Sequence, residues 1–558
     1  MKYETLTSVI RKHIKSALQK NIGELSESTI ELKKIKIGVE RTRSAAFGDF
    51  SSNVAMSLGL SASATMSLAH TICKSLPKKI FAKCEVVKPG FINMTLTIDT
   101  INKVLIDIFK QKSSYGKFAC KKDVFNIEFV SANPTGLLHI GHARNAAYGD
   151  TLANIWQAYG ITVHREYYTN DAGNQINMLG LSTLIRYKEL FGTPAVFPED
   201  GYHGDEIIDI ATAIKEKYGD KYVAAEYSEK GITDEAISEV FKSFAKDYLL
   251  TIIRDTLLEM HVKFDIWSYE SDVYKNNLIP SVLTELKPFI YEADGATFLK
   301  TTLKGDDKDR VLVKSDGGYT YFTPDIAYHK VKLSRGYDKI FNVWGADHKS
   351  YVDRIKIAVE FLGYKQEQVT VLLQQMIKLV KNGEEFKMSK RTGNSLTTMD
   401  LISSIGVDAM RWFLVSTSLN SHLEIDVEKA TENNTNNPLF YVQYAHARIN
   451  QLIDKKKDEY VFTSSFKDLV LPAERELIIT LNSYKQLIES ISNNYEVHRL
   501  NTYLIQLARS YHSYYTNNKI IDSENKKLSI QRYWLSFAVK QVIANALKLL
   551  TITAVDKM

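Results

Sequence analysis

Two histidines stand one helical turn apart in EFVSANPTGLLHIGHARNAAYGD, residues 128–150. The apolar run at 124–130 predicts a buried strand, and the Gly- and Pro-containing turn after it leads into a helix that begins near Gly141. Such a strand-to-helix turn is a natural phosphate site, because free backbone N–H groups and the positive end of the helix dipole point at the ligand. His139 and His142 would share a face and donate to phosphate oxygens, although two half-buried structural imidazoles fit the same pattern.

A second segment that could bind phosphate lies far downstream, in EFKMSKRTGN at residues 385–394. Lys387 and Lys390 stand in a polar, glycine-containing loop after the turn at Asn382 and Gly383. Taken alone, such a segment is typical of a solvated basic loop. Together with the paired histidines, and with a parallel-sheet pattern between the two, it predicts one nucleotide site built from two distant loops.

These segments carry a family resemblance. HIGH at residues 139–142 and KMSKR at residues 387–391 resemble the two signatures of class I aminoacyl-tRNA synthetases. Three stretches are similar to the arginyl-tRNA synthetases in particular: ANPTGLLHIGHARNA (132–146), YTNDAGNQI (168–176) and YVQYAHARI (441–449). The resemblance runs along essentially the whole chain.

The resemblance implies a two-step reaction that uses ATP and Mg²⁺, with no metal ligand from the protein. The carboxylate of L-arginine attacks the α-phosphate of ATP, and a terminal ribose hydroxyl of tRNA(Arg) then attacks the activated carbonyl. Neither step needs a protein nucleophile, so catalysis rests on positioning and on stabilising phosphate charge. The residues expected at ATP are those of the two signatures: His139, Gly141, His142, Lys387, Ser389 and Lys390. The histidines would donate to the phosphates, the glycine would let the backbone approach, and the lysines would close over the β- and γ-phosphates.

A pocket for arginine needs carboxylates, because a guanidinium is always charged and presents five fixed donors. By position in the family motifs, Glu128 and Asn133 would hold the ammonium end of the substrate, with Ser131 beside them. Tyr321 and Asp325 would take the guanidinium. From the residues alone, Glu128 also fits a surface acid on an edge strand, and the other pair fits an aromatic strand followed by a helix N-cap.

The predicted fold is α/β, with a doubly wound, Rossmann-like parallel sheet, an N-terminal α+β domain and a C-terminal all-α bundle. The strands expected in the parallel sheet are 124–130, 162–169, 296–300, 310–314, 339–344 and 369–376. A charged, helical stretch from about 180 to 265 interrupts them as an insertion. Both signature loops fall at strand ends, where ligands of such sheets bind. Asp347 and His348 follow one of these strands without an assigned role.

The chain divides into four predicted regions. They are an N-terminal tRNA-contacting domain (1–115), the catalytic domain (116–396), a connecting helical segment (397–434) and a helical anticodon-binding domain (435–558). The polar run at 433–437 before Pro438 marks the clearest boundary.

Side chains in the two terminal domains are candidates for contact with tRNA bases, which proteins often read by stacking. The candidates are Phe47 and Phe50 near the N-terminus and Tyr441, Gln443, His446 and Arg448 in a C-terminal helix. A purely structural role is the alternative for the N-terminal pair. Tyr444 shares a helix face with two of these residues, and we expect it in the core, where aromatic stripes more often lie.

Composition is that of a globular protein, with 558 residues of which 44% are hydrophobic and 24% charged. The amphipathic start, with an acid at Glu4, indicates no signal peptide, transit peptide or membrane span, so we expect a cytoplasmic protein. We also expect a monomer. Cys73, Cys84 and Cys120 form no C-x-x-C pair, which predicts free, mostly buried thiols rather than zinc or a disulfide framework. The net charge of +6 permits a polyanionic partner without requiring one.

Three other functions remain open on the sequence. A glutamyl, glutaminyl or cysteinyl synthetase would share both signatures, although the missing zinc cysteines weaken the last and NDAGNQI favours the arginyl type. A short adenylate-forming ligase, such as a pantothenate synthetase, would lack the C-terminal helical region. A catalytically dead, synthetase-like RNA-binding protein is the non-enzyme alternative, and the intact signatures argue against it. The resemblance further implies that ATP–pyrophosphate exchange requires tRNA.

Overall fold

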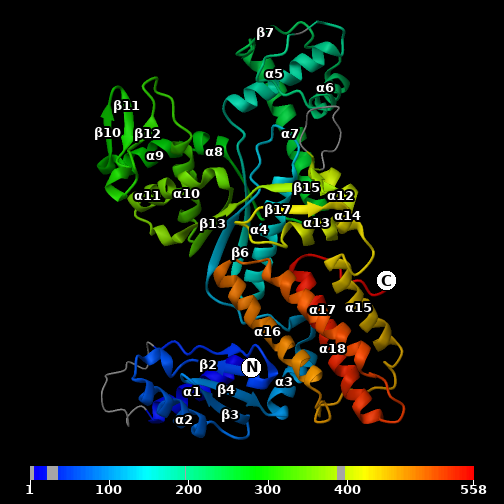
Figure 1. The fold of residues 1–558 in the computed structure, drawn as a ribbon. Coiled ribbons are helices and arrows are strands. Elements are labelled where there is room, and N and C mark those ends of the chain that lie inside the picture. The colour runs from blue at the N-terminus through cyan, green and yellow to red at the C-terminus, as the bar shows by residue number, and fades with distance from the viewer. Residues whose placement is uncertain (1–4, 22–34, 195, 382, 386–395) are drawn as a thin grey trace.

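The computed structural model describes residues 5–21, 35–194, 196–381, 383–385 and 396–558. Its parts form an elongated molecule, with the N-terminal region at one end and a helical insertion at the other (Figure 1). The parallel sheet and the C-terminal helices lie between these ends.

The N-terminal region packs helices on an antiparallel sheet with the strand order β1-β2-β4-β3. Its elements are α1 (Leu6–Asn21), β1 (Glu40–Arg41), β2 (Phe50–Ser52), α2 (Ala62–Ser75), β3 (Phe81–Val87), β4 (Phe91–Leu96) and α3 (Ile98–Gln111). Side chains of a strand point alternately to its two faces. Phe50 of β2, a candidate for contact with tRNA, points into the core and is only 3% exposed.

The cysteines depart from expectation. Cys73 in α2 and Cys84 in β3 form a disulfide, with their Cα atoms 5.6 Å apart. Their elements pack side by side, which places the two residues within bridging distance although no sequence motif marks them. Cys120 is free and exposed. The prediction of three free, mostly buried thiols was therefore wrong.

The central sheet has five strands in the order β14-β13-β5-β6-β9, and every neighbouring pair is parallel. The strands and the first crossover helix are β5 (Val124–Glu128), α4 (Ile140–Ala158), β6 (Thr162–Thr169), β9 (Ile266–Tyr269), β13 (Lys339–Gly345) and β14 (Val369–Gln374). β5 lies between β6 and β13, so the strand order reverses beside it. The predicted doubly wound sheet is confirmed, and its ligand edge lies at the carboxyl ends of β5 and β13.

Two predicted strands belong to a different sheet. β11 (Ala296–Leu299) and β12 (Arg310–Val313) join β10 (Ile290–Ala293) in a separate three-stranded antiparallel sheet. A tight turn at Asp294 and Gly295 sets the β10–β11 hairpin, and both turn residues have a positive φ. Helices α8 (Glu270–Lys275), α9 (Leu278–Glu285), α10 (Phe322–Ser334) and α11 (Val352–Phe361) lie beside this sheet, below it and to its right in Figure 1.

The insertion begins a few residues earlier than predicted. It comprises α5 (Asn174–Glu189), α6 (Asp205–Tyr218), the short hairpin β7 (Tyr227–Ser228) and β8 (Gly231–Ile232), and α7 (Glu235–Glu259). These elements bury their own hydrophobic cluster. They project away from the sheet at the top of Figure 1.

The segment predicted as a helical connection also contains a strand. β15 (Ile377–Lys381) pairs with β16 (Glu384–Glu385) and, in parallel, with β17 (Leu423–Asp426). Between them come α12 (Thr398–Ile405) and α13 (Val407–Leu414), and α14 (Val427–Thr431) follows. The small sheet therefore brackets the second signature on the chain.

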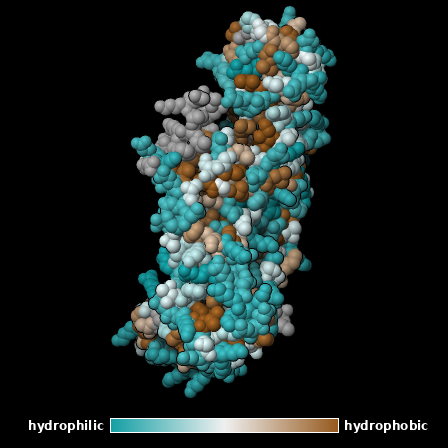
Figure 2. Space-filling model, turned by 90° about the vertical axis from the view of Figure 1, so that its right-hand side faces the viewer, coloured by the Kyte–Doolittle hydropathy of each residue, from teal (hydrophilic) through white to brown (hydrophobic). Residues whose placement is uncertain are grey.

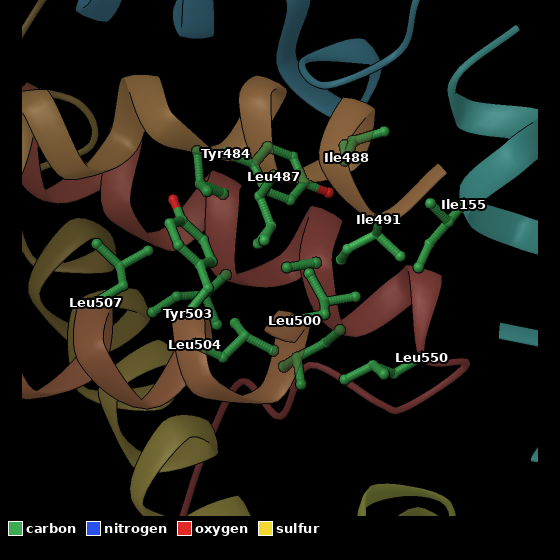
Figure 3. Packing of buried hydrophobic residues seen from close by; sticks show 14 of the residues in the cluster. Ile155, Tyr484, Leu487, Ile488, Ile491, Leu500, Tyr503, Leu504, Leu507 and Leu550 are labelled. Atoms are coloured by element: carbon green, nitrogen blue, oxygen red, sulfur yellow. The ribbon is translucent and has the colours of Figure 1, made fainter. Parts of the chain in front are cut away.

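The C-terminal region is a bundle of α15 (Pro438–Asp454), α16 (Pro472–Asn494), α17 (Arg499–Asn517) and α18 (Lys526–Leu549). In Figure 3, buried side chains of α16 and α17 pack against each other, and Ile491 of α16 lies beside Ile155 of the crossover helix α4. Trp156 Nε1 also donates to the carbonyl of Ser492 at 3.0 Å. The bundle and the catalytic sheet thus share one hydrophobic core.

The surface is mixed. Figure 2 shows hydrophobic residues in separate groups among hydrophilic ones on one face of the molecule. Within the described parts of the chain, no helix has the length and apolar character that a membrane crossing requires.

Candidate active site

Strained backbone follows β5 at the ligand edge of the sheet. Val130 and Ser131 have φ values of 67° and 41°, which residues with a Cβ seldom adopt. Asn145 of α4 holds this turn, because its Oδ1 accepts from Val130 N at 2.8 Å and its Nδ2 donates to Val343 O at 3.1 Å. One side chain therefore joins the ends of β5 and β13.

The two histidines stack at the start of α4, with ring centroids 3.7 Å apart. His139 Nδ1 accepts from Gly141 N at 3.0 Å, and His142 Nδ1 accepts from His139 N at 3.3 Å. Burial, aided by the neighbouring ring, lowers the pKa of His142 to about 3, and partial burial also lowers the pKa of His139. Both rings are therefore neutral, with Nδ1 as acceptor, which leaves the proton on each Nε2 as a donor.

Gly141 has little room for a side chain, since an added Cβ would lie 2.7 Å from Cε1 of His139. The His139 ring folds over the glycine at the first turn of the helix. A glycine is therefore favoured at residue 141, because the His139 ring packs against it.

Lys387, Ser389 and Lys390 of the second signature lie outside the described residues. The chain immediately after them contacts the first signature: Thr398 N donates to Leu138 O at 2.7 Å, and Thr398 Oγ1 donates to His139 O at 3.2 Å. Residues more than 250 positions apart in the sequence are therefore joined by hydrogen bonds.

Arg144 makes a further link between these segments. It is fully buried on α4. Its guanidinium donates to the carbonyls of Gln375, Ser421 and Ser418 at 3.0, 3.1 and 2.9 Å. These acceptors flank β15 and β17, so the helix of the first signature anchors the strands that bracket the second.

A cavity of about 1100 Å³ opens at this edge of the sheet. The predicted residues among those that line it are Glu128, Ser131, Asn133, His139, Gly141, His142, Tyr321 and Asp325. Its volume lies just above the range of about 300–1,000 Å³ that is usual for the pocket of one small ligand. The structure thus brings together every predicted ATP and arginine residue that it describes.

Glu128 is buried at the end of β5, which excludes the reading as a surface acid. Its Oε1 accepts from Ser131 Oγ at 3.1 Å, and its Oε2 lies 2.6 Å from Nζ of the buried Lys332. Ser131 Oγ in turn accepts from Tyr168 N at 3.1 Å. Ser131 therefore orients the carboxylate at the cavity wall.

Asn133 and Tyr321 lie at the edges of the cavity. The amide of Asn133 donates to Gln175 Oε1 at 2.6 Å, which ties it to the start of α5. Tyr321 is 81% exposed just before α10, so its ring stands at the mouth. Both residues therefore lie at the rim of the cavity rather than at its base.

Asp325 lies in the first turn of α10 and faces His329, whose Nδ1 is 3.0 Å from its Oδ1. Burial alone would raise the pKa of this carboxyl. His329, Lys332 and the Tyr351 hydroxyl outweigh that effect and hold the pKa of Asp325 below its usual value. The group is therefore an ionised acceptor in the cavity.

Glu270 is a cavity acid that sequence reasoning missed. It begins α8 directly after β9, is 8% exposed, and accepts from Tyr168 Oη at 3.3 Å. Burial raises its pKa to about 7, with Asp325 and Asp171 adding to the rise and the Tyr168 hydroxyl opposing it. A carboxylate at the end of a parallel strand was the available signal, but the four-residue strand before it was not predicted.

Asp347 and His348 also line the cavity, at its rim. Their side chains are 78% and 57% exposed, with Oδ2 and Nε2 3.4 Å apart. Nothing in their contacts assigns them a role.

Several candidate tRNA residues are used by the fold itself. Gln443 Nε2 donates to Thr553 O at 3.0 Å, and His446 Nδ1 lies 2.9 Å from Val555 O, so both hold the C-terminal tail. Like Phe50, these two are buried and have no face for a base. The tail covers the helix face that Gln443 and His446 share, so the fold does not favour base contact by these residues, which stays a prediction.

The other candidates remain accessible. Phe47 is 52% exposed, and Tyr441 and Arg448 are half-buried. The Arg448 guanidinium carbon lies 4.6 Å from the ring centroid of Tyr444 and 4.9 Å from that of Tyr515. Tyr444, expected in the core, is itself half-buried in this group.

Comparison with known proteins agrees with the arrangement. Residues 8–96 match the arginyl tRNA synthetase N terminal domain, residues 104–464 match the catalytic domain of tRNA synthetases class I (R), and residues 442–558 match the DALR anticodon binding domain. The chain is 46% identical to arginine–tRNA ligase of Malacoplasma penetrans over 98% of its own length and 99% of that protein. It is 39% identical to arginine–tRNA ligase of Bacillus subtilis, over 100% of this chain and 99% of the relative.

Solved structures share the fold. The arginyl-tRNA synthetase of Thermus thermophilus aligns with a TM-score of 0.76 at 19% identity, covering 99% of both chains. That of Plasmodium falciparum aligns with a TM-score of 0.74 at 17% identity, covering 98% of this chain and 99% of the other. With matching catalytic and terminal domains, and with relatives similar over their full length, the chain belongs to the arginyl-tRNA synthetase family of class I aminoacyl-tRNA synthetases.

Proposed function

We propose that this chain is an arginine–tRNA ligase in which the cavity at the ends of β5 and β13 holds arginine beside ATP. One observation carries the proposal: three acids, Glu128, Glu270 and Asp325, line the same cavity as the stacked histidines of the first signature. The acids suit a substrate with two cationic ends, and the histidines suit phosphate.

The guanidinium binds to Asp325 and Glu270, which supply carboxylate oxygens on neighbouring walls of the cavity. Tyr321 closes over it from the mouth. At the other end of the substrate, Glu128, oriented by Ser131, and Asn133 hold the α-ammonium. A planar cation with five donors satisfies such acids better than the single ammonium of lysine does, which favours arginine without an editing domain.

ATP lies against the start of α4. The Nε2 protons of His139 and His142 are available to donate to its phosphates, aided by the helix dipole. Lys387, Ser389 and Lys390 act from the second signature, and the lysines neutralise the β- and γ-phosphates. Mg²⁺ accompanies ATP and shares the charge of its phosphates.

The reaction proceeds in two displacements. A carboxylate oxygen of arginine attacks the α-phosphorus, the bond to the β-phosphate oxygen breaks, and pyrophosphate leaves. The ribose hydroxyl of tRNA(Arg) then attacks the arginyl carbonyl, and AMP leaves as the ester forms. In both steps the protein positions the reactants and stabilises charge.

The two terminal regions contact tRNA(Arg). Phe47 is accessible for stacking in the N-terminal region, and Tyr441 and Arg448 are accessible on the C-terminal bundle. Phe50, Gln443 and His446 are weaker candidates, because the fold buries them. A monomeric state and a cytoplasmic location remain predictions.

Charging assays test the proposal. Purified protein, incubated with ATP, Mg²⁺, tRNA and each amino acid in turn, should charge tRNA with arginine alone. ATP–pyrophosphate exchange should appear with arginine only when tRNA is present. Efficient charging with another amino acid, or exchange without tRNA, would count against the arginyl assignment.

A further inference from the structure

A chain of buried polar side chains connects Glu128 to Asp325 beneath the cavity. Lys332 Nζ donates to Glu128 Oε2 at 2.6 Å and to Asn342 Oδ1 at 2.7 Å. Asn342 Nδ2 lies 2.8 Å from His329 Nε2, and His329 Nδ1 lies 3.0 Å from Asp325 Oδ1 and 2.9 Å from the backbone carbonyl oxygen of Asp325. The three inner residues are at most 1% exposed.

Lys332 determines the direction of every hydrogen bond in this chain. An ammonium only donates, so the atom of Asn342 that faces it must be the carbonyl oxygen, and the amide nitrogen must face the histidine. His329 Nε2 then accepts from that nitrogen, which places the ring proton on Nδ1, toward Asp325. Each link fixes the next, from the lysine to Asp325, whose carboxylate and backbone carbonyl oxygen share the Nδ1 proton.

We propose that Lys332 is a positioning residue for arginine, acting through Asn342 and His329. It holds Glu128 directly and Asp325 through two intermediates, so that both ends of the substrate meet carboxylates in a fixed orientation. The Tyr328 ring, 4.6 Å from Nζ, covers the remaining side of the ammonium. This inference rests on the proposed arginine pocket.

The chain also explains why a lysine is tolerated with no solvent exposure. Glu128 supplies the opposite charge, and the amide oxygen and the aromatic face complete its surroundings. A purely structural ion pair would need only Glu128 as the partner of Lys332. The continuation to Asp325 is what indicates a role in substrate orientation.

Two substitutions of His329 test the chain. His329→Leu removes both links, whereas His329→Gln keeps an oxygen that accepts from Asn342 and an NH₂ that donates to Asp325. In tRNA charging by the full-length protein, we expect His329→Leu to raise KM for arginine by about 10-fold or more, the weight of one hydrogen bond to a charged group. KM for ATP should change by less than about twofold, and His329→Gln should recover most of the loss.

Matched controls separate this role from general stability. His164→Leu removes a hydrogen bond of the same kind to Tyr337, outside the cavity, and should leave KM for arginine unchanged.

The inference is overturned if His329→Leu leaves KM for arginine unchanged, if KM for ATP rises in parallel, or if His329→Gln is as impaired as His329→Leu. Asp325→Asn serves as the reference. If it too has no effect, the arginine pocket itself is misassigned, whereas a large effect of Asp325→Asn alone would refute only the chain.

Discussion

Asp325→Asn should be among the most damaging isosteric changes in the cavity. In the parent, the carboxylate accepts from His329 Nδ1 and keeps acceptor capacity for a guanidinium. An asparagine would turn its oxygen to the same histidine proton. Its NH₂ group would then point at the substrate, where a guanidinium presents only donors.

The expected loss follows from these contacts. Hydrogen bonds to charged groups are worth about 1.5–3 kcal/mol each. Replacing an ion-paired acceptor by an opposed donor removes at least one such bond and adds a repulsive contact, about 3 kcal/mol together. This corresponds to a loss of about 100-fold in kcat/KM for arginine.

Steady-state charging of tRNA, with arginine varied at saturating ATP, measures this loss. Asp353→Asn is the matched control, since Asp353 is exposed on α11 outside the cavity and should retain parental kinetics. Asp353→Asn should unfold at the parental temperature, and Asp325→Asn should remain folded at the assay temperature. A fall of less than about threefold for Asp325→Asn would refute the assignment of Asp325 to the guanidinium.

Three further predictions concern other parts of the molecule. Burial raises the pKa of Glu270 to about 7, and a guanidinium binds the ionised carboxylate, so KM for arginine should rise as the pH falls from 8 to 6. Glu270→Gln should weaken arginine binding and flatten this pH dependence. A parental KM that does not change with pH would contradict the prediction. A Cβ on Gly149 would lie 2.4 Å from the Phe129 ring, so Gly149→Ala should reduce the free energy of unfolding by about 1–3 kcal/mol in urea titrations, and an unchanged midpoint would show that the contact relaxes freely. Protein purified without reductant should offer only Cys120 to a thiol reagent, whereas three reactive thiols in the native state would exclude the disulfide.

The strands of the catalytic sheet were largely predictable, because β5, β13 and β14 are short, largely apolar runs and β6 is rich in Val, Thr and Tyr, which favour strands. Pairing partners were not predictable in the same way. β11 and β12 look like the other strands in sequence, yet they join another sheet, since a run of residues does not encode which neighbour it will bond to.

The functional residues divide in the same way into those that local sequence marks and those that only packing reveals. Glu128 and Asp325 were expected, the first at a strand end and both at positions in a family motif. Lys332 was not, because a lysine in a helix is ordinarily solvated, and only the packing of α10 on the sheet buries it. Likewise, the sequence of the helix does not show that the C-terminal tail covers Gln443 and His446.

The central claim is that two loops far apart in the sequence act on one triphosphate. Single-turnover formation of arginyl-adenylate, with tRNA present, tests it in His142→Ala, Lys390→Ala and the double variant. We expect each single change to slow this step by about 100-fold or more, the usual cost of removing one donor to developing charge, with little change in KM for arginine. Either variant forming the adenylate at the parental rate, while correctly folded, would contradict the claim.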